Sequence, residues 1–278
     1  MRVEAFAKVN FTLELLGKRQ DGYHALRSVV VPVSLSDTLE FALDADISCN
    51  SGFADDLCVK AAKVLRERCA GGKGAAIKIE KRIPVGGGLG GGSADAAATL
   101  VALNELWGLG KSREELAEIG ATVGSDVPAL VLGGAVLMEG RGEKVSRLKL
   151  DSRTIFNLVL VNPGVFCSTA EVYAACRCGH LQNDSSILYN MRHAMECGDC
   201  REVGLALMND LQASAMALHP EILTAMEDLR QAGCISVLMS GSGSTVFGLV
   251  PDEAQGHKIA ALMEAKGYWA RSVHSIVR

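Results

Sequence analysis

The sequence contains few aromatic residues and no surplus of basic charge. Phe, Trp and Tyr together make up 5% of its 278 residues, and the formal net charge is −4. Proteins that coat a polyanion carry a basic stripe, often interleaved with aromatic side chains, whereas Lys and Arg are scattered along this chain. We therefore exclude nucleic acid as a partner, although a local basic pocket for a phosphorylated small molecule is compatible with this composition.

Long apolar runs are also lacking. The most apolar stretch, ISVLMSGSGSTVFGLV, is interrupted by Gly241 and Gly243, and it falls short of the roughly 18–20 apolar residues that a membrane helix requires. The opening residues, MRVEAFAKVN, have neither the charged n-region nor the apolar h-region of a signal peptide. We therefore expect a cytoplasmic protein with no membrane partner.

The nine cysteines of the chain are expected to be thiols, because disulfides are rare in the cytoplasm. One cluster of cysteine and histidine partly matches zinc-ribbon spacing: Cys176, Cys178, His180, His193, Cys197 and Cys200. Its first pair is C-x-C rather than C-x₂-C, and the segment also has the apolar pattern of a helix. Thiols are therefore favoured over a structural zinc site.

Strand and helix patterns alternate along the chain. In the first half we expect strands over residues 5–16, 26–33, 37–43 and 75–83, and helices over residues 54–69 and 92–107. Ser112 and Glu115 form a capping box that predicts another helix start, and Pro128 suits the first turn of a further helix.

The pattern restarts near residue 152. A strand is expected over residues 156–161, helices from residue 168, a strand–turn–strand over residues 235–250 and a last strand over residues 268–277. This alternation predicts an α+β protein built of two α/β sandwich domains, residues 1–152 and residues 153–278.

Six glycines lie within seven consecutive positions, Gly86 to Gly92, directly before an Ala-rich segment. Glycine costs roughly 0.5–1 kcal/mol relative to Ala in regular structure, so this glycine loop needs a reason. A Walker A loop is excluded, because Gly92 is followed by Ser-Ala rather than Lys-Ser/Thr. A dinucleotide fingerprint matches Gly86, Gly88 and Gly91, but no acidic residue ends a strand about 20 residues later.

The interpretation that remains is a phosphate cradle. Consecutive glycines allow backbone N–H groups to point at an anion, and the N-terminus of the following helix adds a positive dipole. The hydroxyl of Ser93 lies where it could bind a phosphate or ligate Mg²⁺. A glycine-rich surface turn is the alternative, and it explains one or two glycines better than six.

The loop and its flanks, Pro84-x-Gly-Gly-Gly-Leu89-Gly-Gly-Gly-Ser93-x-Asp95-Ala96, resemble the ATP loop of the galactokinase, homoserine kinase, mevalonate kinase and phosphomevalonate kinase (GHMP) superfamily. Three further stretches, in the family's order, extend the resemblance over nearly the whole chain: AKVNFTLELLGKRQDGYH, GSDVPALVLGGAVLMEGRGE and MSGSGSTVFGLV. The resemblance implies an ATP- and Mg²⁺-dependent kinase of a small molecule. It also implies an N-terminal domain like ribosomal protein S5 domain 2 and a ferredoxin-like C-terminal domain.

The resemblance also implies roles for individual residues. Asp126 would face the acceptor hydroxyl as the base, with Lys8 as its charged partner. Asp126 could otherwise be only a helix N-cap, and Lys8 only a charge on an edge strand. ATP binding falls on the loop residues Pro84, Gly86, Gly87, Gly88, Leu89, Gly90, Gly91, Gly92 and Ser93.

The resemblance in the first and last of the three stretches implies an acceptor that carries a cytidine diphosphate group, in the non-mevalonate pathway to isoprenoid precursors. By resemblance Tyr23 and His24 bind the cytidine, and Tyr173 is a candidate for the opposite face of the base. Asn10 lies two residues beyond Lys8, so both side chains leave one face of the expected strand toward the substrate. Surface aromatics at a hairpin tip and a ring buried under a helix are the alternatives.

The turn that contains Gly241, Ser242 and Gly243 would contact the substrate diphosphate or close the ATP pocket, unless it is a plain hairpin turn. Another GHMP kinase acting on homoserine or a mevalonate derivative is a second candidate function. An NAD-dependent oxidoreductase that uses the fingerprint match, and a non-catalytic nucleotide-binding protein, are others. We expect a monomer or a weak homodimer.

Overall fold

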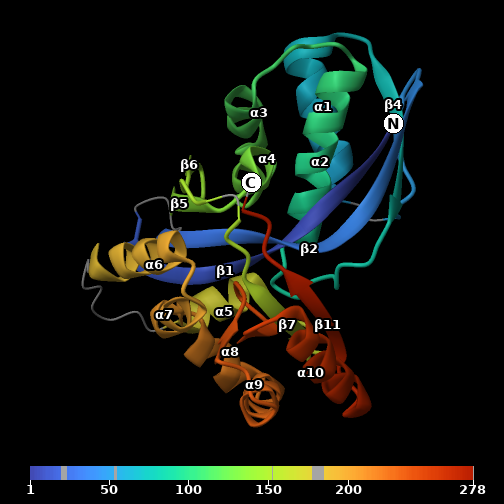
Figure 1. The fold of residues 1–278 in the computed structure, drawn as a ribbon. Coiled ribbons are helices and arrows are strands. Elements are labelled where there is room, and N and C mark those ends of the chain that lie inside the picture. Colours follow the sequence, from blue (N-terminus) through green and yellow to red (C-terminus); the bar gives the residue numbers. More distant parts are fainter. Residues whose placement is uncertain (20–23, 53–54, 152, 177–184, 278) are drawn as a thin grey trace.

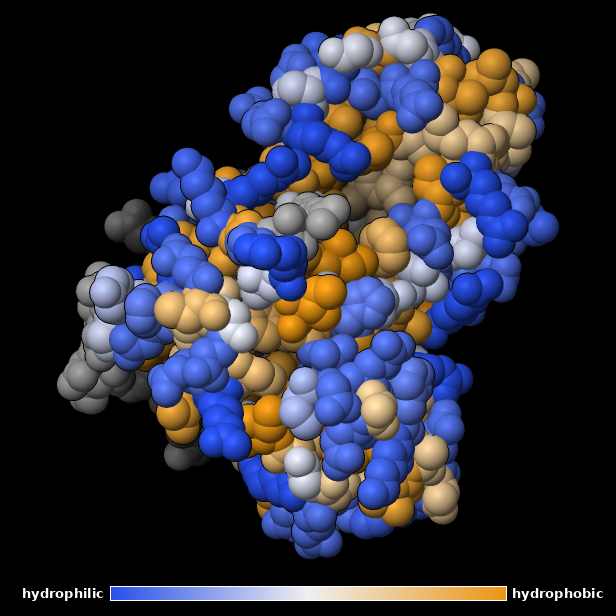
Figure 2. Space-filling view, in the orientation of Figure 1, coloured by the Kyte–Doolittle hydropathy of each residue, from blue (hydrophilic) through white to orange (hydrophobic). Residues whose placement is uncertain are grey.

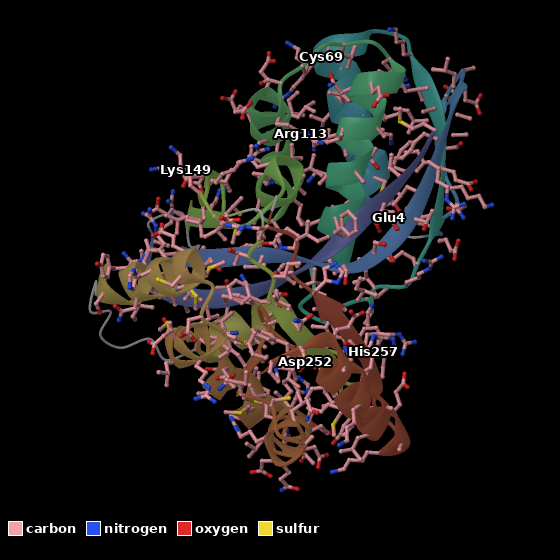
Figure 3. All side chains as sticks on the ribbon, in the orientation of Figure 1. Glu4, Cys69, Arg113, Lys149, Asp252 and His257 are labelled. Carbon is pink, nitrogen blue, oxygen red and sulfur yellow. The ribbon has the colours of Figure 1, made fainter. Side chains whose placement is uncertain are left out.

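The computed structural model describes residues 1–19, 24–52, 55–151, 153–176 and 185–277. Two sheets and their helices form two connected parts, and the long strands β1 (Arg2–Lys18) and β2 (His24–Asp44) cross the middle of the molecule (Figure 1). Polar side chains such as those of Lys149 and His257 lie on the outside (Figure 3). Within these described ranges, no helix is both long and apolar enough to span a membrane.

β1 and β2 form an antiparallel pair in a seven-stranded sheet. The sheet runs in the order β3-β4-β2-β1-β8, and the hairpin of β5 and β6 joins it through β2. These strands are β3 (Ile47–Cys49), β4 (Gly74–Glu80), β5 (Val136–Gly140), β6 (Lys144–Arg147) and β8 (Met208–Asn209). β8 comes from the second half of the chain and pairs in parallel with β1, so this sheet joins both halves.

The helices of the first half pack against this sheet. They are α1 (Leu57–Leu65), a π-helical turn (Arg66–Ala70), α2 (Gly91–Leu106), α3 (Arg113–Gly120) and α4 (Val127–Leu132). Small buried side chains, including Ala94 and Ala97, let α2 lie at the centre of the core. The predicted capping box of Ser112 and Glu115 begins α3, and Pro128 lies in the first turn of α4.

The second half forms a four-stranded antiparallel sheet in the order β11-β7-β10-β9. Its strands are β7 (Asn157–Asn162), β9 (Ser236–Met239), β10 (Val246–Val250) and β11 (Trp269–His274). Its helices are α5 (Thr169–Ala175), α6 (Ser185–Cys197), α7 (Cys200–Ala206), α8 (Gln212–Leu218), α9 (Glu221–Gln231) and α10 (Glu253–Ala265).

Successive side chains of β1 point to opposite faces of its sheet, so the strand contacts different parts of the molecule on its two faces. Ala7, Val9 and Phe11 pack toward the second sheet, where the Phe11 ring centroid lies 5.8 Å from that of Phe156 and 5.9 Å from that of Phe247. The side chains between them, those of Lys8 and Asn10, leave the opposite face of the strand. Burial of the apolar face therefore fixes the direction in which these two polar side chains point.

The structure confirms an α+β protein with most of the expected elements, but the expected strands over residues 26–33 and 37–43 are one continuous strand, β2. β2 pairs with β1 on both sides of residues 33–35, and a register shift between Phe6 and Lys8 accommodates these residues within the strand. The division after residue 152 stays a proposal. β8 and a bridge between Val33 and Ser275 connect the two parts across it.

Candidate active site

A cavity of about 1080 Å³ opens between the glycine loop, the start of α4 and the segment from Phe166 to Ala174. β1 contributes Lys8 and Asn10 to its wall. The second half contributes α5 and the turn over residues 240–243 (the 240–243 turn). Figure 2 shows apolar side chains gathered over the middle of one face of the molecule, with charged and polar side chains around them.

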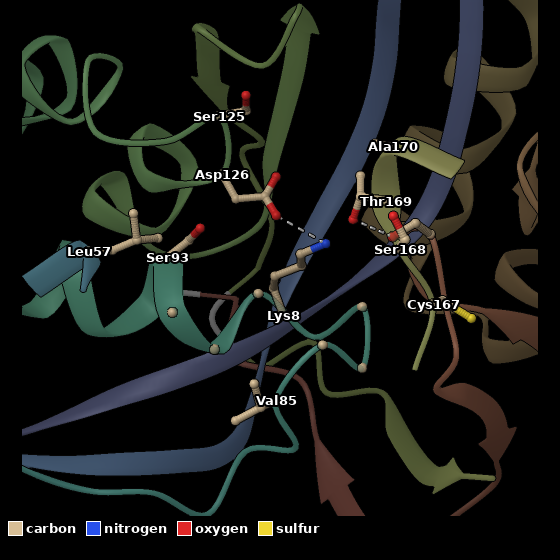
Figure 4. Close-up of a pocket in the computed structure, with 18 of the residues that line it drawn as sticks. Lys8, Leu57, Val85, Ser93, Ser125, Asp126, Cys167, Ser168, Thr169 and Ala170 are labelled. Atoms are coloured by element: carbon tan, nitrogen blue, oxygen red, sulfur yellow. Dashed lines mark hydrogen bonds and ion pairs between the residues drawn. The ribbon is translucent and has the colours of Figure 1, made fainter. Parts of the chain in front are cut away.

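Lys8 and Asp126 meet across this cavity (Figure 4). The Nζ atom of Lys8 lies 3.4 Å from Oδ2 of Asp126, and the two side chains are 5% and 29% exposed. Asp126 holds the N-cap position of α4, yet its side chain makes no capping hydrogen bond among the described residues. Its carboxylate is therefore directed at the ammonium and the cavity.

Lys8 is an interior residue rather than a charge on an exposed sheet edge, because its side chain is 5% exposed and its backbone N–H donates to the carbonyl of Leu89 in the glycine loop. Burying an ammonium is costly unless it is paired and hydrogen-bonded. Besides the ion pair, its Nζ donates to Oδ1 of Asn10 at 2.7 Å. The ion pair and this hydrogen bond can hold the Asp126 carboxylate in a fixed orientation beside the ammonium.

Asn10 is fixed in turn by Ser28 of β2. Nδ2 of Asn10 donates to Oγ of Ser28 at 2.8 Å, and Ser28 Oγ donates to the carbonyl of Thr12 at 2.5 Å. These contacts assign the orientation of the Asn10 amide, with its oxygen toward Lys8. Sequence reasoning missed Ser28, and the only signal for it was a polar residue within a β-branched run.

Replacement of Ser28 by Ala should therefore lower kcat about tenfold, because the amide that positions Lys8 loses its anchor. Ser275 is a matched control, since it is also buried and its Oγ accepts from the backbone N–H of Phe156 at 2.9 Å. Both variants should lose about 1–2 kcal/mol of unfolding free energy. Steady-state kinetics beside thermal unfolding check this, and an equal kcat in the two variants would contradict it.

The glycine loop is held by its carbonyl groups. From the first half, the backbone N–H of Lys8 donates to the carbonyl of Leu89 at 3.0 Å. From the second half, the backbone N–H of Thr245 donates to the carbonyl of Gly87 at 3.1 Å, and Oγ of Ser240 donates to the carbonyl of Gly88 at 3.0 Å. The side chain of Leu89 is buried in the core. The loop is thus tied to both halves of the chain through its carbonyl side.

α2 begins directly from this loop. Its N-cap is Gly90, in the left-handed conformation with φ of 68°, and within the described residues no side chain caps this end. Gly91, Gly92 and Ser93 line the cavity. N–H groups of a first helical turn, together with the helix dipole, make a site for an anion.

The acceptor residues predicted from the sequence are brought together only in part. His24 and Tyr173 both line the cavity, and their ring centroids lie 5.5 Å apart. Tyr23 lies outside the described residues. Ser242 also lines the cavity, and its Oγ lies 2.9 Å from Oγ1 of Thr169 (Figure 4).

The glycines of the 240–243 turn differ in position. Gly241 lines the cavity, whereas a Cβ added at Gly243 would lie 2.8 Å from Sδ of Met239 and 3.5 Å from Sγ of Cys167. Gly243 therefore faces the interior of the second half. The remaining loop residues assigned to ATP, Pro84, Gly86, Gly87 and Gly88, are in the cavity wall.

Below the loop lies a charged cluster that sequence reasoning missed. Nζ of Lys81 contacts Oδ2 of Asp37 at 2.5 Å and Oδ2 of Asp95 at 2.7 Å. Oδ1 of Asp95 is buried without a hydrogen-bond partner among the described residues. Burial raises the pKa of the Asp95 carboxyl to about 7. The cluster joins β2, the segment after β4 and the N-terminal half of α2.

Metal ligands are sparse. Among the described residues, no group of three or more His, Cys, Asp or Glu side chains could hold a metal ion. The cavity wall does hold single oxygen donors, among them the Ser93 hydroxyl and the carboxylates of Asp56, Asp95 and Asp126. This sparse oxygen donor set fits Mg²⁺, which is commonly bound by one or two carboxylates together with substrate phosphates.

The cysteine cluster does not converge within the described residues. Sγ of Cys176 donates to the carbonyl of Asp210, and Sγ of Cys200 donates to that of Val250. The described cysteines are free thiols. Cys178 and His180 lie outside the described residues, so the zinc interpretation is reduced to Cys197 and His193, whose Sγ and Nε2 atoms are 3.9 Å apart.

Comparison with known proteins gives consistent matches. The model of the GHMP kinase N-terminal domain matches residues 56–134, and that of the GHMP kinase C-terminal domain matches residues 191–268. The 4-diphosphocytidyl-2-C-methyl-D-erythritol kinase of Bacillus cytotoxicus is 41% identical over 265 residues, which cover 92% of this chain and 90% of that protein. The enzyme of the same name from Bacillus cereus is 40% identical with the same coverage.

Solved structures agree with these relatives. The crystal structure of a 4-(cytidine 5'-diphospho)-2C-methyl-D-erythritol kinase superposes with a TM-score of 0.85 at 32% identity, over 99% of both chains. Homoserine kinase from Cytophaga hutchinsonii shares the fold, with a TM-score of 0.76 at 17% identity over 100% of this chain and 94% of that one. These matches confirm the kinase class and the GHMP fold expected from the sequence. The chain belongs to the GHMP kinase family and, within it, to the 4-diphosphocytidyl-2-C-methyl-D-erythritol kinases.

Proposed function

We propose that this protein transfers the γ-phosphoryl group of ATP to the 2-hydroxyl of 4-diphosphocytidyl-2-C-methyl-D-erythritol. The products are the 2-phosphate of that compound and ADP, in the non-mevalonate pathway to isoprenoid precursors. The observation that carries the proposal is the Lys8–Asp126 pair, in a cavity with the glycine loop and the His24–Tyr173 pair in its wall. Family membership supports the same substrate.

The chemistry follows from the pair. Phosphoryl transfer to an alcohol needs a positioned hydroxyl, an acceptor for its proton, and positive charge near the moving group. Asp126 accepts the proton of the hydroxyl, and Lys8 keeps that carboxylate directed at the cavity. The N–H groups of the glycine loop and of the first turn of α2 bind the phosphates and stabilise the charge that develops on them.

We also propose Mg²⁺ as the cofactor, because kinases of this kind take ATP as its magnesium complex. When bound, the ion neutralises phosphate charge during transfer. The Ser93 hydroxyl would hold it from the protein side, together with the phosphates of ATP. We propose a cytoplasmic location, which suits the free thiols of the described cysteines, and a monomer or weak homodimer.

On the acceptor side, His24 and Tyr173 present two rings at one end of the cavity. A pyrimidine base offers flat faces and a hydrogen-bonding edge, so an aromatic ring and an imidazole suit it. Homoserine and mevalonate carry no base. The ring pair therefore favours the cytidine compound over these acceptors, and Tyr23 stays a predicted third contact.

An acceptor panel tests this proposal. ADP release should require 4-diphosphocytidyl-2-C-methyl-D-erythritol and be at background with homoserine or mevalonate. Replacement of Tyr173 by Ala should raise the KM for the acceptor about tenfold, since base–aromatic stacking is worth about 1–3 kcal/mol, and leave the KM for ATP unchanged. Tyr189→Ala on the exposed side of α6, where that ring is 69% exposed, is the control.

Turnover with homoserine or mevalonate, but not with the cytidine compound, would keep the fold and overturn the substrate. Equal acceptor KM values in the Tyr173 and Tyr189 variants would overturn the base site. The oxidoreductase alternative is tested by titration with NADH, which should give no binding.

A further inference from the structure

Asn209 is a buried amide outside the cavity wall whose hydrogen-bonding groups converge on the active site. It lies on β8 and is 9% exposed. Its Nδ2 donates to the carbonyls of Met239 and Gly241, both at 2.8 Å, and its Oδ1 accepts from the backbone N–H of Leu211 at 2.9 Å. Both sides of the amide are therefore engaged.

The two carbonyls that Asn209 holds belong to the end of β9 and the 240–243 turn. A Cβ added at Gly241 would lie 3.4 Å from Nζ of Lys8 and 3.5 Å from Oδ1 of Asn10, so the turn backbone lies directly against this pair. Ser240 also reaches the glycine loop, through its hydrogen bond to Gly88. A displacement of this turn would therefore change the packing around the ammonium of Lys8.

β8 is itself attached to the strand that carries Lys8 and Asn10. Met208 pairs with Thr12 and Asn209 with Leu13, in parallel register. The contacts thus close a ring that runs from β1 to β8, through the Asn209 amide to the 240–243 turn, and from the turn back to Lys8. Pairing of the two-residue strand β8 with β1 therefore fixes the position of Asn209 relative to the strand that carries Lys8 and Asn10.

We propose that Asn209 is a positioning residue of the phosphoryl-transfer site, which fixes the 240–243 turn against Lys8 and Asn10. This inference rests on the proposed function. An amide suits the position because it supplies two N–H donors and an acceptor at once. An aspartate at this position would still accept the hydrogen bond from the backbone N–H of Leu211. Its second oxygen, however, would repel the carbonyl oxygens of Met239 and Gly241, because it cannot donate to them.

The test compares Asn209→Asp and Asn209→Ala with a matched control. Asn104 is the control because its amide also bonds backbone on both sides, to the N–H of Lys111 at 2.9 Å and its carbonyl at 3.1 Å, at the far end of α2. We expect kcat per folded enzyme to fall at least about tenfold in both Asn209 variants. Asn104→Ala should keep kcat within about twofold, with a similar loss of thermal stability.

The KM values distinguish positioning from a general loss of structure. We expect the KM for the acceptor to rise and the KM for ATP to stay within about twofold of the wild-type value. The glycine loop that binds ATP keeps two other hydrogen bonds, from the backbone N–H groups of Lys8 and Thr245 to the carbonyls of Leu89 and Gly87. Unchanged kcat per folded enzyme, or equal rises in both KM values, would overturn the inference. An inactive wild-type protein would instead overturn the proposed function, so the two failures are distinguishable.

Discussion

Replacement of Asp126 by Asn is expected to lower kcat by about 10²–10⁴-fold, the range that general base catalysis contributes. The amide keeps the size and position of the carboxylate but cannot accept the proton of the acceptor hydroxyl. It also removes the charge that lies 3.4 Å from Nζ of Lys8. The KM values should change little, because the change acts on the reacting centre rather than on the loop or the ring pair.

Coupled ADP release measures this, with Asp151→Asn as a control at an exposed carboxylate that pairs only locally with Arg153. Thermal stability of the Asp126 variant should fall, because the buried ammonium of Lys8 loses its charged partner, so kcat is compared per folded enzyme. A kcat within about threefold of wild type would show that Asp126 is not the base.

Replacement of Gly88 by Ala should abolish ATP binding and destabilise the fold. Gly88 has φ of 76°, and its added Cβ would lie 2.9 Å from the carbonyl oxygen of Gly243 and closer still to that of Ser240. These are backbone atoms of the other half of the chain, so the methyl group forces the glycine loop and the 240–243 turn apart. We expect a loss of ATP affinity of at least about 10²-fold.

Gly108→Ala separates steric contact from backbone strain. Gly108 has φ of 65°, but nothing lies within 4 Å of the added Cβ. Both variants share a strain of about 1–2 kcal/mol, whereas only Gly88→Ala should lose ATP binding in a calorimetric titration. Equal ATP affinity in the two variants would show that the close approach of loop and turn is not needed for binding.

The parts of the site that could be predicted from the sequence are those that local patterns determine. The glycine run before an Ala-rich segment predicted the loop and α2, and the two-residue period of a strand placed Lys8 and Asn10 on one face. Asp126 lies at the helix start that its place before Pro128 indicated.

The parts that could not be predicted depend on contacts between distant segments. Asn209 reaches carbonyls 30 and 32 residues away, and Lys81 joins Asp37 and Asp95 across 44 and 14 residues. No periodicity in one sequence marks such pairs. Ser28 is similar, since a serine inside a β-branched run shows that something polar is bonded but not what it is bonded to.

The most direct test of the account is ³¹P NMR of the reaction mixture. Wild-type protein with ATP, Mg²⁺ and 4-diphosphocytidyl-2-C-methyl-D-erythritol should give a new phosphomonoester resonance, coupled to the position of the 2-hydroxyl, in equal amount to ADP. The Asp126→Asn variant should not give it on the same timescale. ADP formed with free phosphate and no new phosphomonoester, or a phosphomonoester at another hydroxyl, would contradict the account.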